Sequence, residues 1–100
     1  MATNPPAKRP NVHRLSVPAN SEVSFDFAGV VTVIDFSIKT VEEVDVRISF
    51  DEGGTFSADN YFLLESGDVW YQQDINWTHA TQMWFRSEAG TITVQIIYWG

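Results

Sequence analysis

The sequence contains no cysteine, which excludes both a disulfide framework and a metal site built from thiolates. No apolar run approaches the roughly 18 residues that a membrane-spanning helix needs, and the start of the chain lacks the apolar core of a secretory signal. No segment keeps the spacing of an amphipathic helix. We therefore expect a complete small protein made in the cytoplasm, with one domain and one hydrophobic core, because 100 residues suffice for that.

Positive charge is scarce and unevenly placed. The chain has 6 Lys and Arg against 13 Asp and Glu, for a formal net charge of −7. Lys8, Arg9 and Arg14 lie in the first 14 residues, which contain three of the four prolines and no carboxylate. Proline breaks helices and disfavours central strands, so residues 1–11 are predicted to form an extended basic arm. The acidic remainder would repel phosphates, which argues against a nucleic-acid partner.

Alternation of apolar and polar residues predicts β-strands. It places one set of side chains inward and the next on the opposite face, so that Val46 is expected in the core and Arg47 outside it. The run 30–38 is more uniformly apolar, which predicts a strand that is covered on both faces or that passes through an interface. About eight strands are expected, at 12–17, 22–27, 30–38, 43–50, 61–64, 69–73, 82–86 and 91–99.

Turn residues separate these strands at short intervals, as at Asp51-Glu52-Gly53-Gly54. Many short strands with frequent turns predict an all-β fold, in which residues 12–100 form a single antiparallel β-sandwich. Eight strands favour a jelly roll. An immunoglobulin-like sandwich is the second choice, although its usual cysteine pair is absent.

No motif indicates catalysis or a cofactor. His13 and His79 have no nucleophile placed beside them, and no GxSxG sequence occurs. The acidic loop from Asp51 to Asn60 does not match the ligand spacing of an EF-hand, so a solvated turn is the better interpretation. We therefore expect a protein that is not an enzyme and that holds neither a metal nor a cofactor.

Aromatic residues give the strongest functional indication. In a strand, neighbours point to opposite faces, so one ring of Trp70-Tyr71 and one of Trp84-Phe85 should leave the core. A thin sandwich cannot house every aromatic side chain, and the surplus should form an exposed patch that either anchors an interface or stacks on a sugar. The predicted partner-binding residues are Lys8, Arg9, Arg14, Trp70, Trp77, Trp84 and Trp99.

Several segments resemble those of small virion structural proteins of tailed bacteriophages. They are the stretch from Leu15 to Val23, the Ser49-Phe50-Asp51 sequence, the turn Leu64 to Asp68 and the apolar strand Thr91 to Trp99. The resemblance implies a small β-sandwich or jelly roll that decorates (cements) the outside of a capsid, or that occupies another structural position in the head or tail. It carries over no catalytic residue.

The resemblance leads us to expect a non-enzymatic capsid decoration protein, located in the virion. Its expected partners are other copies of itself, with a trimer favoured by the resemblance, and the phage major capsid protein; neither nucleic acid nor a membrane is expected. One alternative is a carbohydrate-binding sandwich that uses Trp70, Trp77 and Trp84. Another is a component of the tail or of the head–tail connector.

Overall fold

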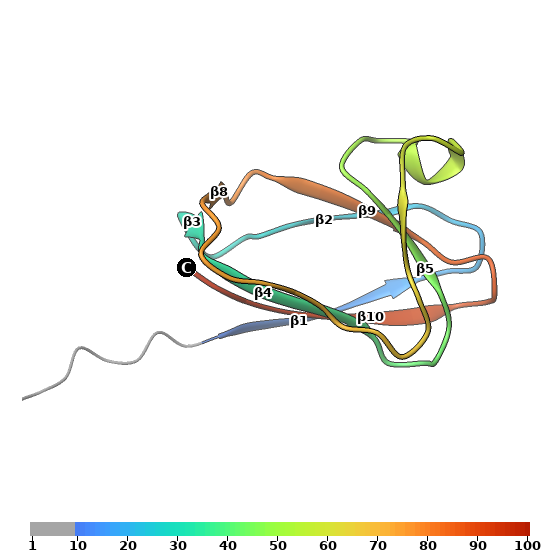
Figure 1. Cartoon of the computed structure of the whole chain (residues 1–100), viewed down its shortest axis with the longest axis horizontal. Helices are drawn as coiled ribbons and strands as arrows, with labels where there is room; N and C mark the ends of the chain where they lie inside the picture. The colour runs from blue at the N-terminus through green and yellow to red at the C-terminus, as the bar shows by residue number, and fades with distance from the viewer. Residues whose placement is uncertain (1–9) are drawn as a thin grey trace, which may run out of the picture.

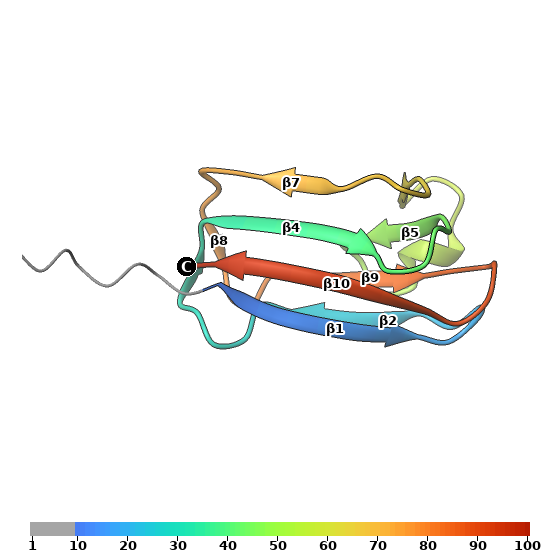
Figure 2. The ribbon, with the colours of Figure 1, turned by 90° about the horizontal axis from the view of Figure 1, so that it is seen from below.

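The computed structural model describes residues 10–100, which form two four-stranded antiparallel sheets packed face to face (Figure 1). Figure 2 shows the first sheet from outside, in the order β1 (Asn11–Val17), β10 (Ile92–Trp99), β4 (Asp35–Thr40) and β7 (Trp70–Gln72). The second sheet has the order β2 (Val23–Asp26), β9 (Gln82–Arg86), β5 (Val46–Ser49) and β6 (Phe62–Leu64). The prediction of an all-β antiparallel sandwich is confirmed.

Two smaller elements complete the described chain. A short ribbon of β3 (Thr32–Val33) and β8 (Trp77–Thr78) lies at one end of the sandwich, close to the C-terminus (Figure 1). A 3-10 helix, η1 (Gly54–Phe56), follows β5 and is held by the Glu22 carboxylate, which accepts hydrogen bonds from the backbone N–H groups of Gly53 (2.6 Å) and Thr55 (3.1 Å). No helix long and apolar enough to cross a membrane is found in residues 10–100.

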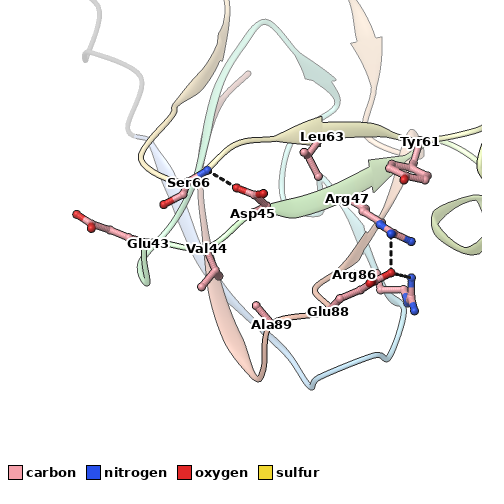
Figure 3. Close-up of a pocket in the computed structure, with 10 residues that line it drawn as sticks. All are labelled: Glu43, Val44, Asp45, Arg47, Tyr61, Leu63, Ser66, Arg86, Glu88 and Ala89. Atoms are coloured by element: carbon pink, nitrogen blue, oxygen red, sulfur yellow. Dashed lines mark hydrogen bonds and ion pairs between the residues drawn. The ribbon is translucent and has the colours of Figure 1, made fainter.

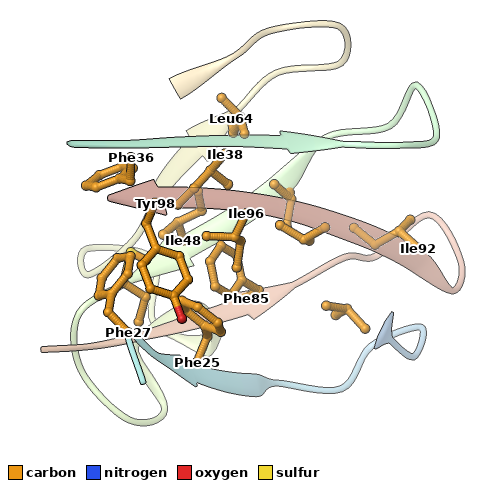
Figure 4. Packing of buried hydrophobic residues seen from close by; sticks show 14 of the residues in the cluster. Phe25, Phe27, Phe36, Ile38, Ile48, Leu64, Phe85, Ile92, Ile96 and Tyr98 are labelled. Carbon is orange, nitrogen blue, oxygen red and sulfur yellow. The ribbon is translucent and has the colours of Figure 1, made fainter. Parts of the chain in front are cut away.

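The core lies between the two sheets and follows the predicted alternation. Along β10 every second side chain is buried, and Figure 4 shows Ile96 and Tyr98 pointing toward rings from the opposite sheet. The Tyr98 ring lies 5.9 Å from that of Phe25 and 5.2 Å from that of Phe27, both edge-on. Burying an apolar side chain of this size stabilises the fold by about 1.5–3 kcal/mol. Val46 is fully buried and Arg47 lies on the opposite face, as predicted.

The prediction of one continuous, covered strand over residues 30–38 is wrong, while the alternative that this segment passes through an interface stays a prediction. The segment is split at Ile34 into β3 and β4, which pair with different strands, and Val31 is 83% exposed instead of covered. The cause is a change of partner: the Ile34 N–H donates to the Trp99 carbonyl (2.8 Å), while the Ile34 carbonyl accepts from Ile75 N–H (2.9 Å). β3 and β8, two residues each, are too short for periodicity to detect, so ten strands are present in residues 10–100 where eight were expected.

The structure also differs from the prediction at the N-terminal arm and at the end of β5. The structure describes the predicted arm, residues 1–11, only from Pro10 onward, and Asn11 already belongs to β1. At the end of β5, Ser49 is buried and Phe50 is 43% exposed, whereas strict alternation predicts Phe50 inside. Gly54 explains the reversal, because its backbone approaches Ser49 so closely that a Cβ there would lie 2.8 Å from the Ser49 Cβ. η1 thus covers Ser49, and the chain turns Phe50 outward.

Candidate functional site

The open side between β6 and β7 is closed by aromatic rings. β7 is an edge strand of the first sheet and β6 is an edge strand of the second, so the space between the two sheets opens to solvent between these strands. Four side chains meet there: Phe50, Phe62, Trp70 and Trp77, which we call the aromatic edge. The Phe62 and Trp70 rings are 4.8 Å apart and edge-on, those of Phe50 and Trp77 are 5.6 Å apart and edge-on, and those of Phe50 and Phe62 are stacked at 6.2 Å.

The aromatic edge is anchored on the core. Phe36 of β4 is fully buried and lies 4.8 Å from the Trp70 ring and 5.3 Å from the Trp77 ring. Trp70 and Trp77 are half-buried, while Phe50 and Phe62 remain 43% and 37% exposed. Rings held from beneath in this way lose little conformational entropy when a ligand covers them, so they form a preorganised binding surface.

Carboxylates and an amide border the exposed phenylalanines. An open groove of about 380 Å³ lies against Phe50 and Phe62 and is also lined by Asp51, Asp59 and Asn60. Asn60 Nδ2 donates a 2.9 Å hydrogen bond to Asp51 Oδ2, and both aspartates are exposed. Aromatic faces beside carboxylates and an amide can bind a ligand that combines an apolar surface with cationic or hydroxyl groups.

A second cavity, of about 490 Å³, contains an arginine pair (Figure 3). Arg47 of β5 and Arg86 of β9 stand directly opposite each other in register, and both contact the Oε1 atom of Glu88, at 2.5 Å and 2.9 Å. The Arg47 guanidinium also lies over the Tyr61 ring, 4.6 Å from its centroid. Because one carboxylate pairs with both cations, this cluster connects β5, β9 and the loop after β9, and we assign it a structural role.

The structure does not bring the predicted basic residues to the aromatic edge. Lys8 and Arg9 lie outside the described residues. Arg14 is exposed on β1, where its Nη2 donates a 3.5 Å hydrogen bond to Gln95 Oε1. β1 and β7 are at opposite ends of the first sheet, so Arg14 is remote from the aromatic edge.

Two of the four predicted tryptophans come together and two do not. Trp70 and Trp77 belong to the aromatic edge. Trp84 alternates with buried neighbours on β9 and lies on the outer face of the second sheet, whereas Trp99 follows buried Tyr98 and lies on the outer face of the first. The expectation that one ring of each adjacent aromatic pair leaves the core is confirmed, since Tyr71 is exposed and Trp84 is half-buried.

Sequence reasoning missed Phe50 and Phe62. Alternation placed Phe50 inward, and the available signal was its position directly before a Gly-Gly turn, where a strand ends and its register stops. Within residues 10–100 no group of three or more His, Asp or Glu side chains is placed to hold a metal. His13 packs on the Phe25 ring at 5.2 Å, and the Nδ1 atom of His79 lies 3.2 Å from the Val31 carbonyl oxygen.

Comparison with known proteins supports the fold but indicates no family. No protein-family profile matches the chain, and no curated protein matches it. Among solved structures, the chain is similar to the crystal structure of PirA, with 17% sequence identity and a TM-score of 0.51 over 95% of this chain and 99% of that one. At this identity the likeness concerns the fold alone. The two chains therefore share an all-β architecture over nearly their whole lengths.

Proposed function

We propose that the chain is a non-enzymatic structural protein of a bacteriophage virion, a capsid decoration protein that binds the outside of the head shell and stabilises it. The aromatic edge carries the proposal. It gathers half-exposed rings from β6, β7, β8 and the end of β5 at the margin of both sheets, and such rings are typical anchors of protein interfaces. A protein that cements a shell works through surfaces of this kind.

The order of the strands supports a jelly roll, the finer form of the predicted sandwich. Apart from the β3-β8 ribbon, the chain passes between the sheets at every connection except the hairpin from β5 to β6. The resulting orders, β1-β10-β4-β7 and β2-β9-β5-β6, are those of two nested Greek keys. Jelly rolls recur in viral capsid and lectin domains, so this topology favours the proposal by analogy, and also favours sugar binding.

Charge supports a role in assembly. The basic residues Lys8 and Arg9 precede a strongly acidic body, and this separation suits a segment that binds a neighbouring acidic surface while the bodies keep one another from random association. We propose other copies of this chain, in a trimer, and the phage major capsid protein as the partners.

Mass spectrometry of gradient-purified particles tests the virion assignment. The particles are prepared from the organism that encodes the chain, and the copy number is measured relative to the major capsid protein. A decoration protein is expected at a ratio near that of the capsid subunits, and removing it should lower the temperature at which heads release DNA. Absence from the particles would refute the proposal, and a few copies per particle would place the chain in the tail or the connector.

A second candidate function is carbohydrate binding, favoured by the groove beside Phe50. A sugar ring could stack on a phenylalanine face while the Asp51 and Asn60 side chains bind hydroxyl groups. Of the tryptophans predicted for this role, Trp70 and Trp77 adjoin the groove through Phe62 and Phe50, and Trp84 does not. A glycan array with the unchanged protein and with Phe50→Ala tests this; binding that Phe50→Ala abolishes would support it.

A further inference from the structure

The groove beside the aromatic edge combines aromatic side chains with carboxylates. Phe50 and Phe62 are partly exposed to solvent, and Asp51 and Asp59 stand next to them on the loop that follows β5. Asp51 accepts a hydrogen bond from Asn60, and the two phenylalanine side chains remain 43% and 37% exposed although their rings stack on each other. The surface therefore offers apolar planes and negative charge side by side.

That combination fits an extended, basic, proline-rich segment. Proline-rich chains dock in aromatic-lined grooves because their rings pack flat on aromatic faces and because the polyproline II conformation is already ordered. Lys and Arg side chains of the same segment pair with carboxylates at the border of the groove. This helix has three residues per turn, so a proline and a base three positions apart share one face, separated by about 9 Å.

The chain itself contains such a segment. Residues 1–10 include the adjacent prolines Pro5 and Pro6, followed by Lys8 and Arg9, and they contain no carboxylate. Pro5 is three positions before Lys8, and Pro6 is three positions before Arg9. In the polyproline II conformation, either proline–base pair would present a ring and a cation on one face, the chemical combination that a phenylalanine beside an aspartate can bind. The remaining residues, from Asn11 onward, carry all 13 carboxylates, so the charges are complementary as well.

Residues 1–10 can reach this groove more readily in a second copy than in their own copy. Asn11 pairs with Tyr98 on β1, which is the strand of the first sheet farthest from β7. To reach its own aromatic edge, the segment would have to turn sideways at Pro10 and pass across about 14 Å of sheet width, because Asn11 lies in one row with Tyr98, Phe36 and Gln72. Proline-rich segments are stiff over several residues, which opposes such a turn. A neighbouring copy can approach the segment from any side, so no turn is required there.

We propose that the aromatic edge is the binding site for residues 1–10 of a second copy of this chain. Pro5 and Pro6 pack on Phe50 and Phe62, and Lys8 and Arg9 pair with the neighbouring aspartates. The proposal rests on the proposed function only in treating the aromatic edge as an assembly surface. The contact joins two different surfaces, so when each copy passes its segment to the next copy it is heterologous and can close into a ring such as the predicted trimer.

Charge reversal in the full-length chain tests the contact, with sedimentation equilibrium as the measurement. Lys8→Glu/Arg9→Glu reverses the segment, and Asp51→Lys/Asp59→Lys reverses the groove. Each pair is expected to weaken self-association roughly tenfold or more, because like charges then face each other. The chain that carries all four substitutions should associate again. Glu43→Lys, a single reversal of the same kind at an exposed residue on the other cavity, should leave association unchanged.

A synthetic peptide of residues 1–10 tests the same contact without a folding change. Added in excess, it should dissociate the full-length oligomer, and a peptide with Pro5 and Pro6 replaced by serine should not. A monomeric full-length chain, or an oligomer that keeps its mass in the Lys8→Glu/Arg9→Glu variant, would overturn the inference. Neither result affects the presence of the protein on particles, so failure here and failure of the proposed function are separate outcomes.

Discussion

Glu88 should stabilise the fold because its carboxylate attracts two arginines that repel each other. Arg47 and Arg86 are cross-strand neighbours, and each has a guanidinium nitrogen within 3 Å of the same carboxylate oxygen of Glu88. Those two nitrogens can therefore be no more than about 6 Å apart. At that separation two unit charges repel by about 1 kcal/mol in a water-like medium and by about 3 kcal/mol at an effective dielectric constant of 20.

Glu88→Gln removes the negative charge and keeps the shape and a hydrogen-bonding oxygen. The arginine side chains are 26% and 13% exposed and Glu88 is 49% exposed, so the site lies between the two dielectric limits. We expect the substitution to lower the free energy of unfolding by about 1–2 kcal/mol at low salt, more than an isolated surface ion pair contributes. In about 1 M salt the Debye length falls to about 3 Å, so the substitution should lower the free energy of unfolding by less.

Urea unfolding followed by tryptophan fluorescence measures the effect. Adding Arg47→Gln to Glu88→Gln removes the repulsion, so the double variant should be more stable than the sum of the two single losses predicts, with a coupling of about 1 kcal/mol. Glu43→Gln is the matched control, because Glu43 lines the same cavity but forms no ion pair with residues 10–100. A neutral Glu88→Gln at low salt, or strict additivity in the double variant, would refute the reasoning.

Three further predictions concern the fold. Val46→Asp buries an unpaired carboxylate in a fully enclosed position and should unfold the domain, which circular dichroism would show as loss of the β-sheet signal. Gly54→Ala places a Cβ within 2 Å of Ser49 Oγ and should cost about 1–3 kcal/mol in urea unfolding, and Ser49→Gly should relieve part of that loss. Burial, and second the charge of Asp26, raise the pKa of Tyr98, so the folded state keeps the phenolic proton above pH 10, where the unfolded state loses it. Stability should therefore fall as the pH rises above about 10, and Tyr98→Phe should flatten that dependence in thermal melts at increasing pH.

Alternation predicted the core because most strands have one face covered. The inward positions of β2 with the residue after it, and those of β10, follow the sequence pattern, as at Phe25 and Phe27 or at Ile96 and Tyr98. Where a strand changes partner, the pattern misleads. Ile34 is bonded to β10 on one side and to the segment before β8 on the other, and nothing local in the run 30–38 encodes that division.

The aromatic edge was only partly predictable for a related reason. The Trp70-Tyr71 pair indicated an outward ring, since neighbours in a strand point to opposite faces. The meeting of Phe50, Phe62 and Trp77 depends on which strands form the margin of each sheet, a property of the whole topology. Phe50 additionally depends on the close approach of Gly54 to Ser49, which ends the alternation of β5.

The position of β10 ties folding of the domain to the synthesis of its last strand. This strand lies between β1 and β4, and its inward side chains fill the middle of the core, yet it is the last strand of the domain to leave the ribosome. Until then β1 and β4 have no neighbour in common, and their apolar faces stay unpaired. Pairing Asn11 with Tyr98 also closes almost the whole chain into one loop, which slows folding. A nascent chain that stops before Ile92 should consequently remain unfolded and depend on chaperones.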